Sequence, residues 1–305
     1  MSSINVNGLT HDYGHGRGVF DVSFEVADRE TLGFLGPNGA GKSTTMRHLM
    51  GFSKPQSGSA AINGLDCRKR SNDVMQSVGY LPGEVAIPEG LNGRQFIKMM
   101  QDMKNCRDDK RTDYLLERFK LDPSGPVKKM SIGEKRKLAV VTAFMSDPDI
   151  LLLDEPTSGL DPMMQEVFID FIREEKQRGK TILLSSHIFS EVEALCDRIA
   201  IIKDGRLVST VDALQIRHGL HNIMTVEFDD PQEFTEFGRQ DLNFRLRDRS
   251  TLSCSVVVDD EDVNRFIRAI RNFRIKSFKE HSVTLEEYFM HFYKNDRTYG
   301  GAGYA

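Results

Sequence analysis

Long hydrophobic segments are missing from this 305-residue sequence. The apolar runs 150–153 and 199–202 are far shorter than the roughly 20 residues that a helix needs to cross a bilayer. Cysteines are also few, and the four present, at positions 67, 106, 196 and 254, form no C-x-x-C pair. This spacing argues against a zinc module or a disulfide framework. We therefore expect reduced thiols in a cytoplasmic protein.

An excess of basic residues is missing as well. The sequence has 41 Lys and Arg residues against 45 Asp and Glu residues, which gives a formal net charge of −4. This balance does not favour general nucleic-acid binding. Residues 1–5 lack the basic and then apolar pattern of a secretory signal. Hydrophobic content of 39% and charged content of 28% indicate an ordinary globular protein, long enough for two domains.

The most informative stretch reads G-x-x-x-x-G-K-S, the pattern of a phosphate-binding P-loop. The apolar run 31–35 before it predicts a buried strand, and the periodicity of 45–50 after it predicts a helix. Glycines let the backbone N–H groups face one anion at the helix N-terminus. We expect Lys42 to reach the β- and γ-phosphates of a nucleoside triphosphate and Ser43 to hold Mg²⁺. The predicted phosphate-binding residues are Gly36, Pro37, Asn38, Gly39, Ala40, Gly41, Lys42, Ser43 and Thr44.

Two further strands are expected to end beside this loop. The apolar run 150–153 ends in Asp154 and Glu155. With a P-loop upstream, we expect Asp154 to join the Mg²⁺ shell and Glu155 to orient or deprotonate the attacking water, the alternative being an exposed acidic turn. His187 follows the strand expected at 181–186. It has either a structural role or a γ-phosphate contact, and its place at the same sheet edge favours the contact.

Residues 84–146 have a different character, because they show helical periodicity with no strand pattern. They predict a helical insertion into an α/β core. Within the insertion, Met99, Met100 and Met103 either line an adaptable docking surface or belong to the core.

Two smaller features have two interpretations each. Tyr13, in the polar, turn-rich stretch 11–16, is either a surface residue or a stacking platform for a flat base. Ser131 and Glu134 predict a capping box at the start of a helix. That helix is either an ordinary capped helix or, through its N-terminus, an anion site.

Five motifs thus follow one another in order: the P-loop at 36–44, Ser131-x-Gly133-Glu134-Lys135, 151–157, 158–162 and Ser186-His187. Each motif alone is common, but the ordered set is specific. It resembles the nucleotide-binding subunit of ATP-binding cassette (ABC) transporters over about residues 3–214. The sequence is most similar to ATPase subunits of bacterial export-type systems whose membrane part is a separate chain.

The resemblance implies a P-loop NTPase core of the RecA-like type, with a mixed sheet and a helical subdomain. It also implies roles for single residues. Tyr13 would stack on adenine. Ser131 and Gly133 would bind the γ-phosphate held by the opposite subunit, and Asp161 would communicate across that dimer.

The resemblance further implies an enzyme, an ATPase that uses ATP and Mg²⁺, with Glu155 as catalytic glutamate and His187 as switch histidine. The implied partners are a second nucleotide-binding subunit, identical or a sister ATPase, and an integral-membrane permease. The chain would lie on the inner face of the cell membrane and export a drug, peptide, lipid or similar substrate, without binding nucleic acid. The alternative is a soluble ABC ATPase acting on nucleic acid or the ribosome, although such relatives typically carry fused cassettes, long coiled-coil insertions or C-x-x-C modules.

The sequence departs from the family pattern at several positions. Ile132 stands where the family usually has Gly, and Glu134 where it usually has Gln. Gly83, followed by Glu84, stands where a Gln usually contacts Mg²⁺. We hypothesise that Glu84 substitutes as a metal-shell or water-positioning group.

The sequence predicts a second, smaller domain after the cassette. We expect the nucleotide-binding domain to cover 1–214 and a small α/β accessory domain to cover 215–296. Apolar runs at 223–228 and 251–258 predict strands in that accessory domain. The glycine-rich end, 297–305, predicts a flexible tail.

Overall fold

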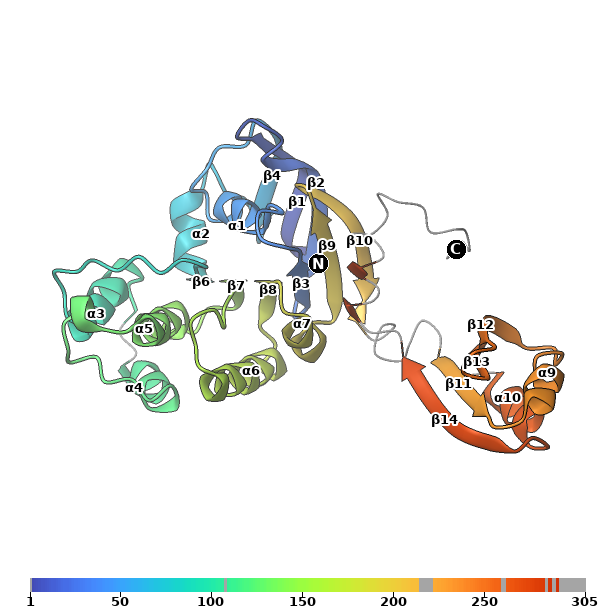
Figure 1. The fold of residues 1–305 in the computed structure, drawn as a ribbon. Coiled ribbons are helices and arrows are strands. Elements are labelled where there is room, and N and C mark those ends of the chain that lie inside the picture. The colour runs from blue at the N-terminus through green and yellow to red at the C-terminus, as the bar shows by residue number, and fades with distance from the viewer. Residues whose placement is uncertain are drawn as a thin grey trace. The chain divides into compact units, whose positions relative to one another are not determined.

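The computed structural model describes residues 2–106, 109–213, 222–258, 262–282, 285–286 and 289–290. The chain divides into two compact units, Met1–Val211 and Asp212–Ala305 (Figure 1). We call the first the cassette and the second the C-terminal unit. The domain boundary expected after residue 214 and the tail expected at 297–305 lie outside the described residues, and both stay predictions.

A mixed six-stranded sheet forms the centre of the cassette, in the order β10-β9-β3-β8-β7-β6. β3 pairs in parallel with β8 and β9, and β7 pairs in parallel with β6 and β8. The expected α/β class with a mixed sheet is therefore confirmed. The strands are Thr31–Leu35 (β3), Val78–Leu81 (β6), Ile150–Asp154 (β7), Thr181–Ser186 (β8), Arg198–Lys203 (β9) and Arg206–Asp212 (β10).

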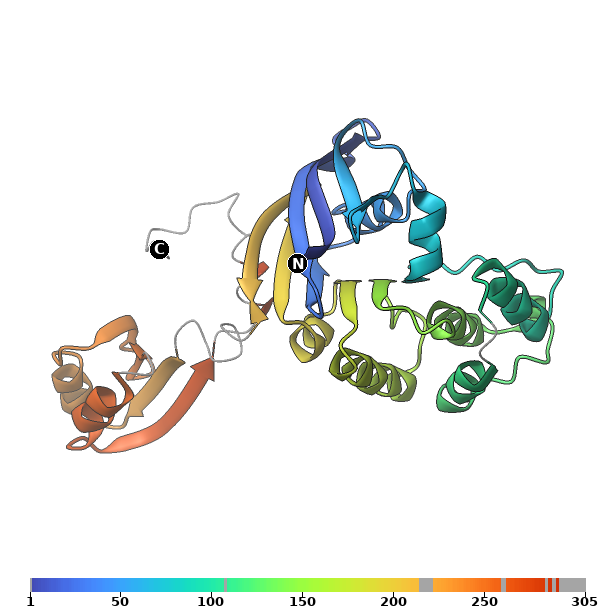
Figure 2. The same ribbon diagram turned by 180° about the vertical axis from the view of Figure 1, so that it is seen from behind.

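Helices cover both faces of this sheet, which explains why every residue of β3, β7 and β8 is buried. Figures 1 and 2 show α1 (Lys42–Leu49) on one face and α6 (Pro162–Gln177) and α7 (Phe189–Leu195) on the other. The apolar runs that predicted these strands are continuous rather than alternating, as burial on both faces requires.

A second, antiparallel sheet has the order β2-β1-β4-β5. Its strands are Ser2–Asp12 (β1), Gly18–Ala27 (β2), Ser57–Ile62 (β4) and Leu65–Asp66 (β5). The polar stretch expected to be a loop at 11–16 is shorter than predicted, because Asp12 at the end of β1 pairs with Gly18 at the start of β2. Long antiparallel pairing therefore extends strands into residues whose polarity alone favours a turn.

The stretch after β6 is helical in its described residues. It contains α3 (Gly93–Met103), α4 (Asp109–Arg118), the 3₁₀ turn Val127–Lys129 and α5 (Ile132–Phe144), while α2 (Ser71–Ser77) precedes β6. The capping box predicted from Ser131 and Glu134 is confirmed at the start of α5. Phe144 of α5 contacts the rings of Phe168 and Phe171 of α6, so aromatic packing joins the helical part to the core.

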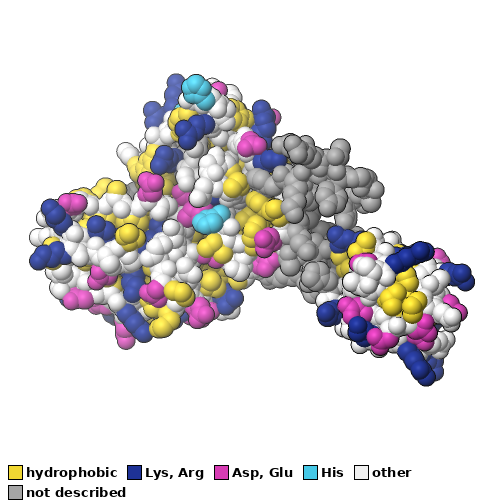
Figure 3. Space-filling view, viewed as in Figure 1, with side chains coloured by type: hydrophobic (Ala, Val, Ile, Leu, Met, Phe, Trp, Pro, Cys, Tyr) yellow, Lys and Arg dark blue, Asp and Glu magenta, His cyan; other side chains and the backbone are white. Residues whose placement is uncertain are grey.

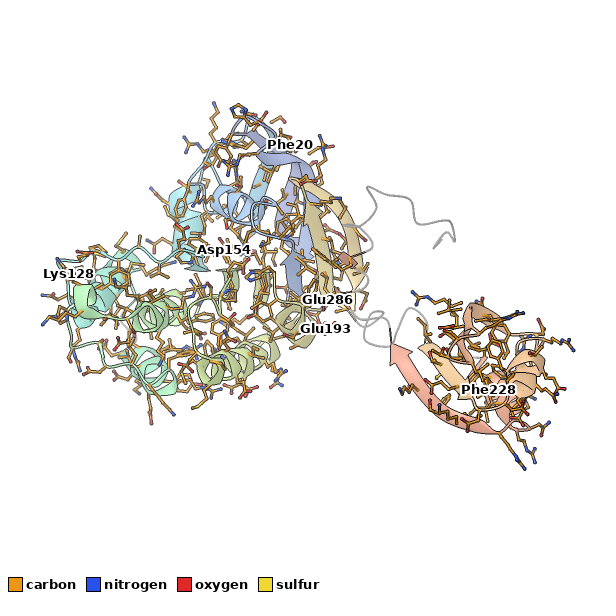
Figure 4. All side chains as sticks on the ribbon, in the orientation of Figure 1. Phe20, Lys128, Asp154, Glu193, Phe228 and Glu286 are labelled. Atoms are coloured by element: carbon orange, nitrogen blue, oxygen red, sulfur yellow. The ribbon has the colours of Figure 1, made fainter. Side chains whose placement is uncertain are left out.

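The C-terminal unit has a β-α-β-β-α-β order: Asn222–Phe228 (β11), Pro231–Phe237 (α9), Asn243–Asp248 (β12), Ser253–Val258 (β13), Val263–Ile270 (α10) and Ile275–Ser282 (β14). The antiparallel sheet runs β12-β13-β11-β14, the arrangement of ferredoxin-like domains. Its core includes Phe228, labelled in Figure 4, with Phe237 and Phe266. Among the described residues of both units, no helix is long and apolar enough to span a membrane.

The close approach of β6 to the end of α5 provides a test of the core packing. A Cβ added to Gly79 would lie 2.5 Å from the Ala143 carbonyl oxygen and 2.6 Å from Pro148 Cγ. We expect Gly79→Ala to lower the free energy of unfolding by about 1–3 kcal/mol, because the backbone has to move. Chemical denaturation measures this change. Gly125→Ala is the control, since a Cβ there meets nothing within 4 Å; equal losses for the two variants would contradict the packing account.

Candidate active site

The P-loop connects β3 to α1. Gly39 and Gly41 have φ values of +85° and +109°, in the region that favours glycine. A Cβ on Gly41 would lie 2.8 Å from Val19 Cγ1, so no larger side chain fits there. No side chain caps α1, and its first turn contains no acidic residue. The N–H groups at its N-terminus are therefore suited to an anion.

Three residues from separate motifs meet beside this loop. Lys42, 5% exposed, donates hydrogen bonds from Nζ to the carbonyl oxygens of Gly36 at 2.6 Å and Pro37 at 3.2 Å. The same Nζ lies 3.0 Å from Glu155 Oε1, without the alignment of a hydrogen bond. The other carboxylate oxygen, Glu155 Oε2, lies 2.6 Å from His187 Nδ1. The structure thus brings Lys42, Glu155 and His187 together.

The end of β7 fixes the two acidic residues. Asp154, labelled in Figure 4, is 2% exposed, and its Oδ1 accepts a hydrogen bond of 2.5 Å from Ser185 Oγ. Glu155 has a φ of +47°, which turns its side chain away from the direction of the strand. Its N–H donates to the Ser185 carbonyl oxygen at 3.0 Å. Pairing with β8 therefore holds both carboxylates in place.

A cleft of about 580 Å³ opens at this edge of the sheet. It is lined by Asn38 and Ser43 of the P-loop and by Glu84, Asp154, Glu155 and His187. Tyr80 also lines the cleft; burial, and then the charge of Asp154, raise its pKa to about 12, so the phenol is neutral at physiological pH. The cleft is therefore lined by residues for which the sequence predicts phosphate binding, metal binding and activation of water.

The oxygen donors in this cleft suit Mg²⁺. Ser43 presents an exposed hydroxyl, Asp154 a buried carboxylate, and Glu84 an exposed carboxylate. Gly83 adjoins the Asp154 carboxylate, since a Cβ there would lie 3.1 Å from Asp154 Oδ2. Within the described residues, no group of three or more His, Cys, Asp or Glu forms a metal cage.

The start of α5 lies apart from the cleft lining. Ser131 Oγ donates to Glu134 Oε2 at 2.8 Å and accepts from the Glu134 N–H at 3.2 Å. Hydrogen bonds from the Ser131 N–H and hydroxyl lower the pKa of Glu134, so its carboxylate is ionised at neutral pH. Ile132 is 79% exposed. Gly133 lies close to the next motif, because a Cβ there would be 3.3 Å from the Gly159 carbonyl oxygen.

Asp161 and Tyr13 also lie outside the cleft lining. Asp161 caps α6 by accepting a hydrogen bond from the Met164 N–H at 3.0 Å. Tyr13 is 53% exposed, and its ring centre lies 4.4 Å from that of His11. The ring is accessible for stacking, and its proposed adenine contact stays a prediction.

Sequence reasoning missed two buried charged residues near this site. Arg136, 2% exposed, lies within the run Lys135-Arg136-Lys137, which resembles a solvated helix face. Glu191, 4% exposed, accepts hydrogen bonds from the hydroxyls of Thr157 and Ser186. Burial raises the pKa of Glu191. No periodicity signal distinguishes these two residues from exposed neighbours, because Thr157 and all the partners of Arg136 come from distant parts of the chain.

The position of Lys42 predicts its contribution to ligand affinity. We expect Lys42→Met to weaken ATP binding at least tenfold, about 1.4 kcal/mol, because the cation that faces the phosphates is lost. Titration calorimetry on the purified chain measures this affinity. Lys69→Met is the control, since Lys69 is exposed and does not line the cleft. Unchanged affinity in Lys42→Met would contradict the placement of the phosphates.

The sequence and the fold both match known proteins. A family profile described as "ABC transporter" matches residues 19–158. An uncharacterized ABC transporter ATP-binding protein, YcbN of Bacillus subtilis (strain 168), is 30% identical over 94% of this chain and 95% of its own length. The daunorubicin resistance ATP-binding protein DrrA3 of Streptomyces coeruleorubidus is 31% identical over 97% of each chain. The Nod factor export ATP-binding protein I of Rhizobium johnstonii is 31% identical over 94% of each.

Solved structures confirm the predicted P-loop NTPase fold. An ATP-binding subunit of an ABC transporter superposes with a TM-score of 0.66 at 30% identity, over 71% of this chain and 92% of that one. The dimeric ABC transporter cassette MJ0796 superposes with a TM-score of 0.62 over 69% of this chain and 98% of its own, and its 20% identity supports the fold alone. The chain belongs to the ATP-binding subunits of ABC transporters, and it is an ATPase of that family.

Proposed function

We propose that two copies of this chain, or one copy and a sister ATPase, sandwich two Mg-ATP molecules and drive a separate membrane permease. The observation that carries this proposal is the separation of two phosphate-binding elements. Asn38 and Ser43 line the cleft, whereas Ser131 and Gly133 do not. The exposed N-terminus of α5 is then free to meet the γ-phosphate bound to a neighbouring copy.

Relatives support the export direction and the dimer. Two relatives that match over nearly their full length are named for daunorubicin resistance and for Nod factor export. The solved cassette MJ0796, which has the same fold, is dimeric. We propose that this chain likewise serves export of a drug, peptide, lipid or similar substrate, and that the permease selects it.

Lys42 and the residues that line the cleft have separate chemical roles in this proposal. Lys42 would offset the charge of the β- and γ-phosphates. Glu155, freed from Lys42 by the nucleotide, would orient or deprotonate the attacking water. His187, already hydrogen-bonded to Glu155, would contact the γ-phosphate and hold the carboxylate in position. Bound Mg²⁺ would stabilise phosphate charge, with Ser43 and Asp154 as ligands and Glu84 beside them.

Glu134, at the start of α5, stands where the family usually has Gln, and this difference affects the part of the site that would bind the neighbour's γ-phosphate. Ser131 Oγ is bonded to the Glu134 carboxylate, whose negative charge lies at the helix N-terminus where a phosphate would bind. Binding the neighbour's γ-phosphate requires Ser131 to change its hydrogen-bond partner. Gly159 lies beside Gly133 at the start of α5, and Asp161 follows it two residues later. In this proposal, Asp161 transmits a change at the start of α5 from one copy to the other.

We propose that the permease contacts α3. Met99 and Met103 of this helix line a surface depression of about 670 Å³ together with Arg94, Gln95, Lys98 and Asp102. Met103 is 63% exposed, so it does not belong to the core. Flexible thioether side chains, flanked by charged ones, suit an adaptable apolar contact with a polar rim.

The charge distribution is less favourable to the alternative, a soluble ABC ATPase acting on nucleic acid or the ribosome. Figure 3 shows Lys and Arg interspersed with Asp and Glu on the described surface in view, without one continuous basic field. Nucleic-acid binding relies on such a field to contact phosphates. A pull-down from detergent extract discriminates directly, because a co-purifying multi-span membrane protein supports the transporter function.

The sandwich arrangement predicts different effects for its two halves. We expect Glu155→Gln to reduce ATP hydrolysis at least 100-fold while ATP-bound dimers accumulate, because the closed dimer opens only after hydrolysis. We expect Ser131→Arg to abolish turnover while each monomer still binds ATP. Steady-state hydrolysis and light scattering after size exclusion measure these effects. A Glu155→Gln variant that hydrolyses ATP at the wild-type rate would refute the catalytic role.

Permease docking on α3 predicts the effect of a surface charge. We expect Met103→Glu to reduce co-purification with the permease at least fivefold, because a carboxylate disrupts an apolar contact. The melting temperature should stay within about 2 °C, as for most exposed substitutions. Val208→Glu, at another exposed apolar position, is the control. Equal co-purification of the two variants argues against docking at this depression.

A further inference from the structure

Among the described residues of the cassette, Arg136 is the largest fully buried side chain. It lies on α5, five residues after Ser131, and extends toward the end of the central sheet. Its Nε donates to the Pro156 carbonyl oxygen at 2.9 Å. One terminal nitrogen donates to the carbonyl oxygens of Pro82 and, at 3.3 Å, of Gly83. The other donates to those of Glu155 and, at 3.1 Å, of Asp154.

These contacts match the full donor capacity of a guanidinium group. Arginine has five N–H donors in a planar fork, and Arg136 makes hydrogen bonds to five carbonyl oxygens. All five acceptors belong to the backbone of two segments, 82–83 and 154–156. Lysine has three donors at one point and no fork, so it cannot reproduce this arrangement.

The two segments are the ones that carry the reacting groups. Segment 154–156 contains Asp154 and Glu155. The left-handed φ of Glu155 is held by hydrogen bonds from its N–H to Ser185 of β8 and from Arg136 to its carbonyl oxygen. Segment 82–83 immediately precedes Glu84, which lines the cleft. Arg136 therefore connects α5 to both walls of the cleft through backbone atoms.

Burying this cation carries a free-energy cost of desolvation. Burial lowers the pKa of Arg136 to about 10, and the charges of Asp154, Glu155 and Glu191 oppose that decrease, so the side chain is charged at neutral pH. None of the five hydrogen bonds above goes to a carboxylate. A buried ion of this kind contributes geometric specificity more readily than stability.

We propose that Arg136 is a positioning residue that couples the N-terminus of α5, with Ser131, to the backbone that orients Glu155 and Glu84. A change in the position of α5 is then transmitted to the water-positioning carboxylate in the same chain. This inference rests on the proposed function, in which Ser131 meets the γ-phosphate of a neighbouring copy. The guanidinium fork, rather than the positive charge alone, carries the coupling.

The test compares Arg136→Lys, which keeps the charge, and Arg136→Gln, which keeps a planar donor, in the full chain. We expect both to reduce kcat at least tenfold per folded molecule, with the ATP affinity of the monomer within about threefold of the wild type. Steady-state hydrolysis, titration calorimetry and circular dichroism give these values. A purely structural role would reduce hydrolysis and ATP binding together, in proportion to the folded fraction.

Lys180→Gln is the matched control. Lys180 is also buried, at 5% exposure, and its Nζ binds Asp147 and Asp149, none of which lines the cleft. We expect this variant to lose stability but to keep kcat per folded molecule within twofold. The proposal is overturned if Arg136→Lys also keeps its kcat within twofold, or if both Arg136 variants fail to fold under conditions in which Lys180→Gln folds.

The Glu155→Gln variant separates this proposal from the proposed function. If Glu155→Gln forms no ATP-dependent dimer, the sandwich is wrong, whatever Arg136 does. If it forms dimers, we expect Arg136→Lys combined with Glu155→Gln to need at least fivefold more ATP for half-maximal dimer formation. Identical ATP requirements would overturn the coupling while leaving the sandwich intact.

Discussion

Parallel pairing of β3, β7 and β8 is the constraint on which the site depends. Because neighbouring parallel strands end at one sheet edge, the P-loop after β3, the acids after β7 and His187 after β8 converge there. The result is the contact of Glu155 with both Lys42 and His187. Lys42 and Glu155, more than 100 positions apart in the sequence, are thus brought to 3.0 Å from each other.

The same edge is held by backbone hydrogen bonds as well as by strand pairing. Ser185 forms hydrogen bonds with both the Asp154 carboxylate and the Glu155 N–H, and Arg136 donates hydrogen bonds to the carbonyl groups of the same segment. A residue with a left-handed φ is strained unless its surroundings fix it. The hydrogen bonds from Ser185 and Arg136 fix the backbone of Glu155, as expected for a residue whose carboxylate must keep one orientation.

The C-terminal unit illustrates partial prediction of a fold. The apolar runs at 223–228 and 251–258 predicted β11 and β13. α9 and β12 were missed, since α9 has only seven residues and β12 carries three charged side chains among six residues. Both elements owe their structure to the shared core around Phe228 and Phe237 rather than to their own pattern.

The sequence by itself determined the motifs, because a P-loop, an acid-terminated strand and a capping box are local patterns with local physical causes. It therefore identified the family, the buried strands of the central sheet and the start of α5. Only the tertiary structure decided which motifs share a cleft, that the Ser131–Glu134 capping box lies outside the lining of that cleft, and that Met103 is exposed. Only the structure revealed the contacts of Arg136. Its five partners are backbone carbonyl oxygens, which every residue has, so no residue type in the sequence marks them.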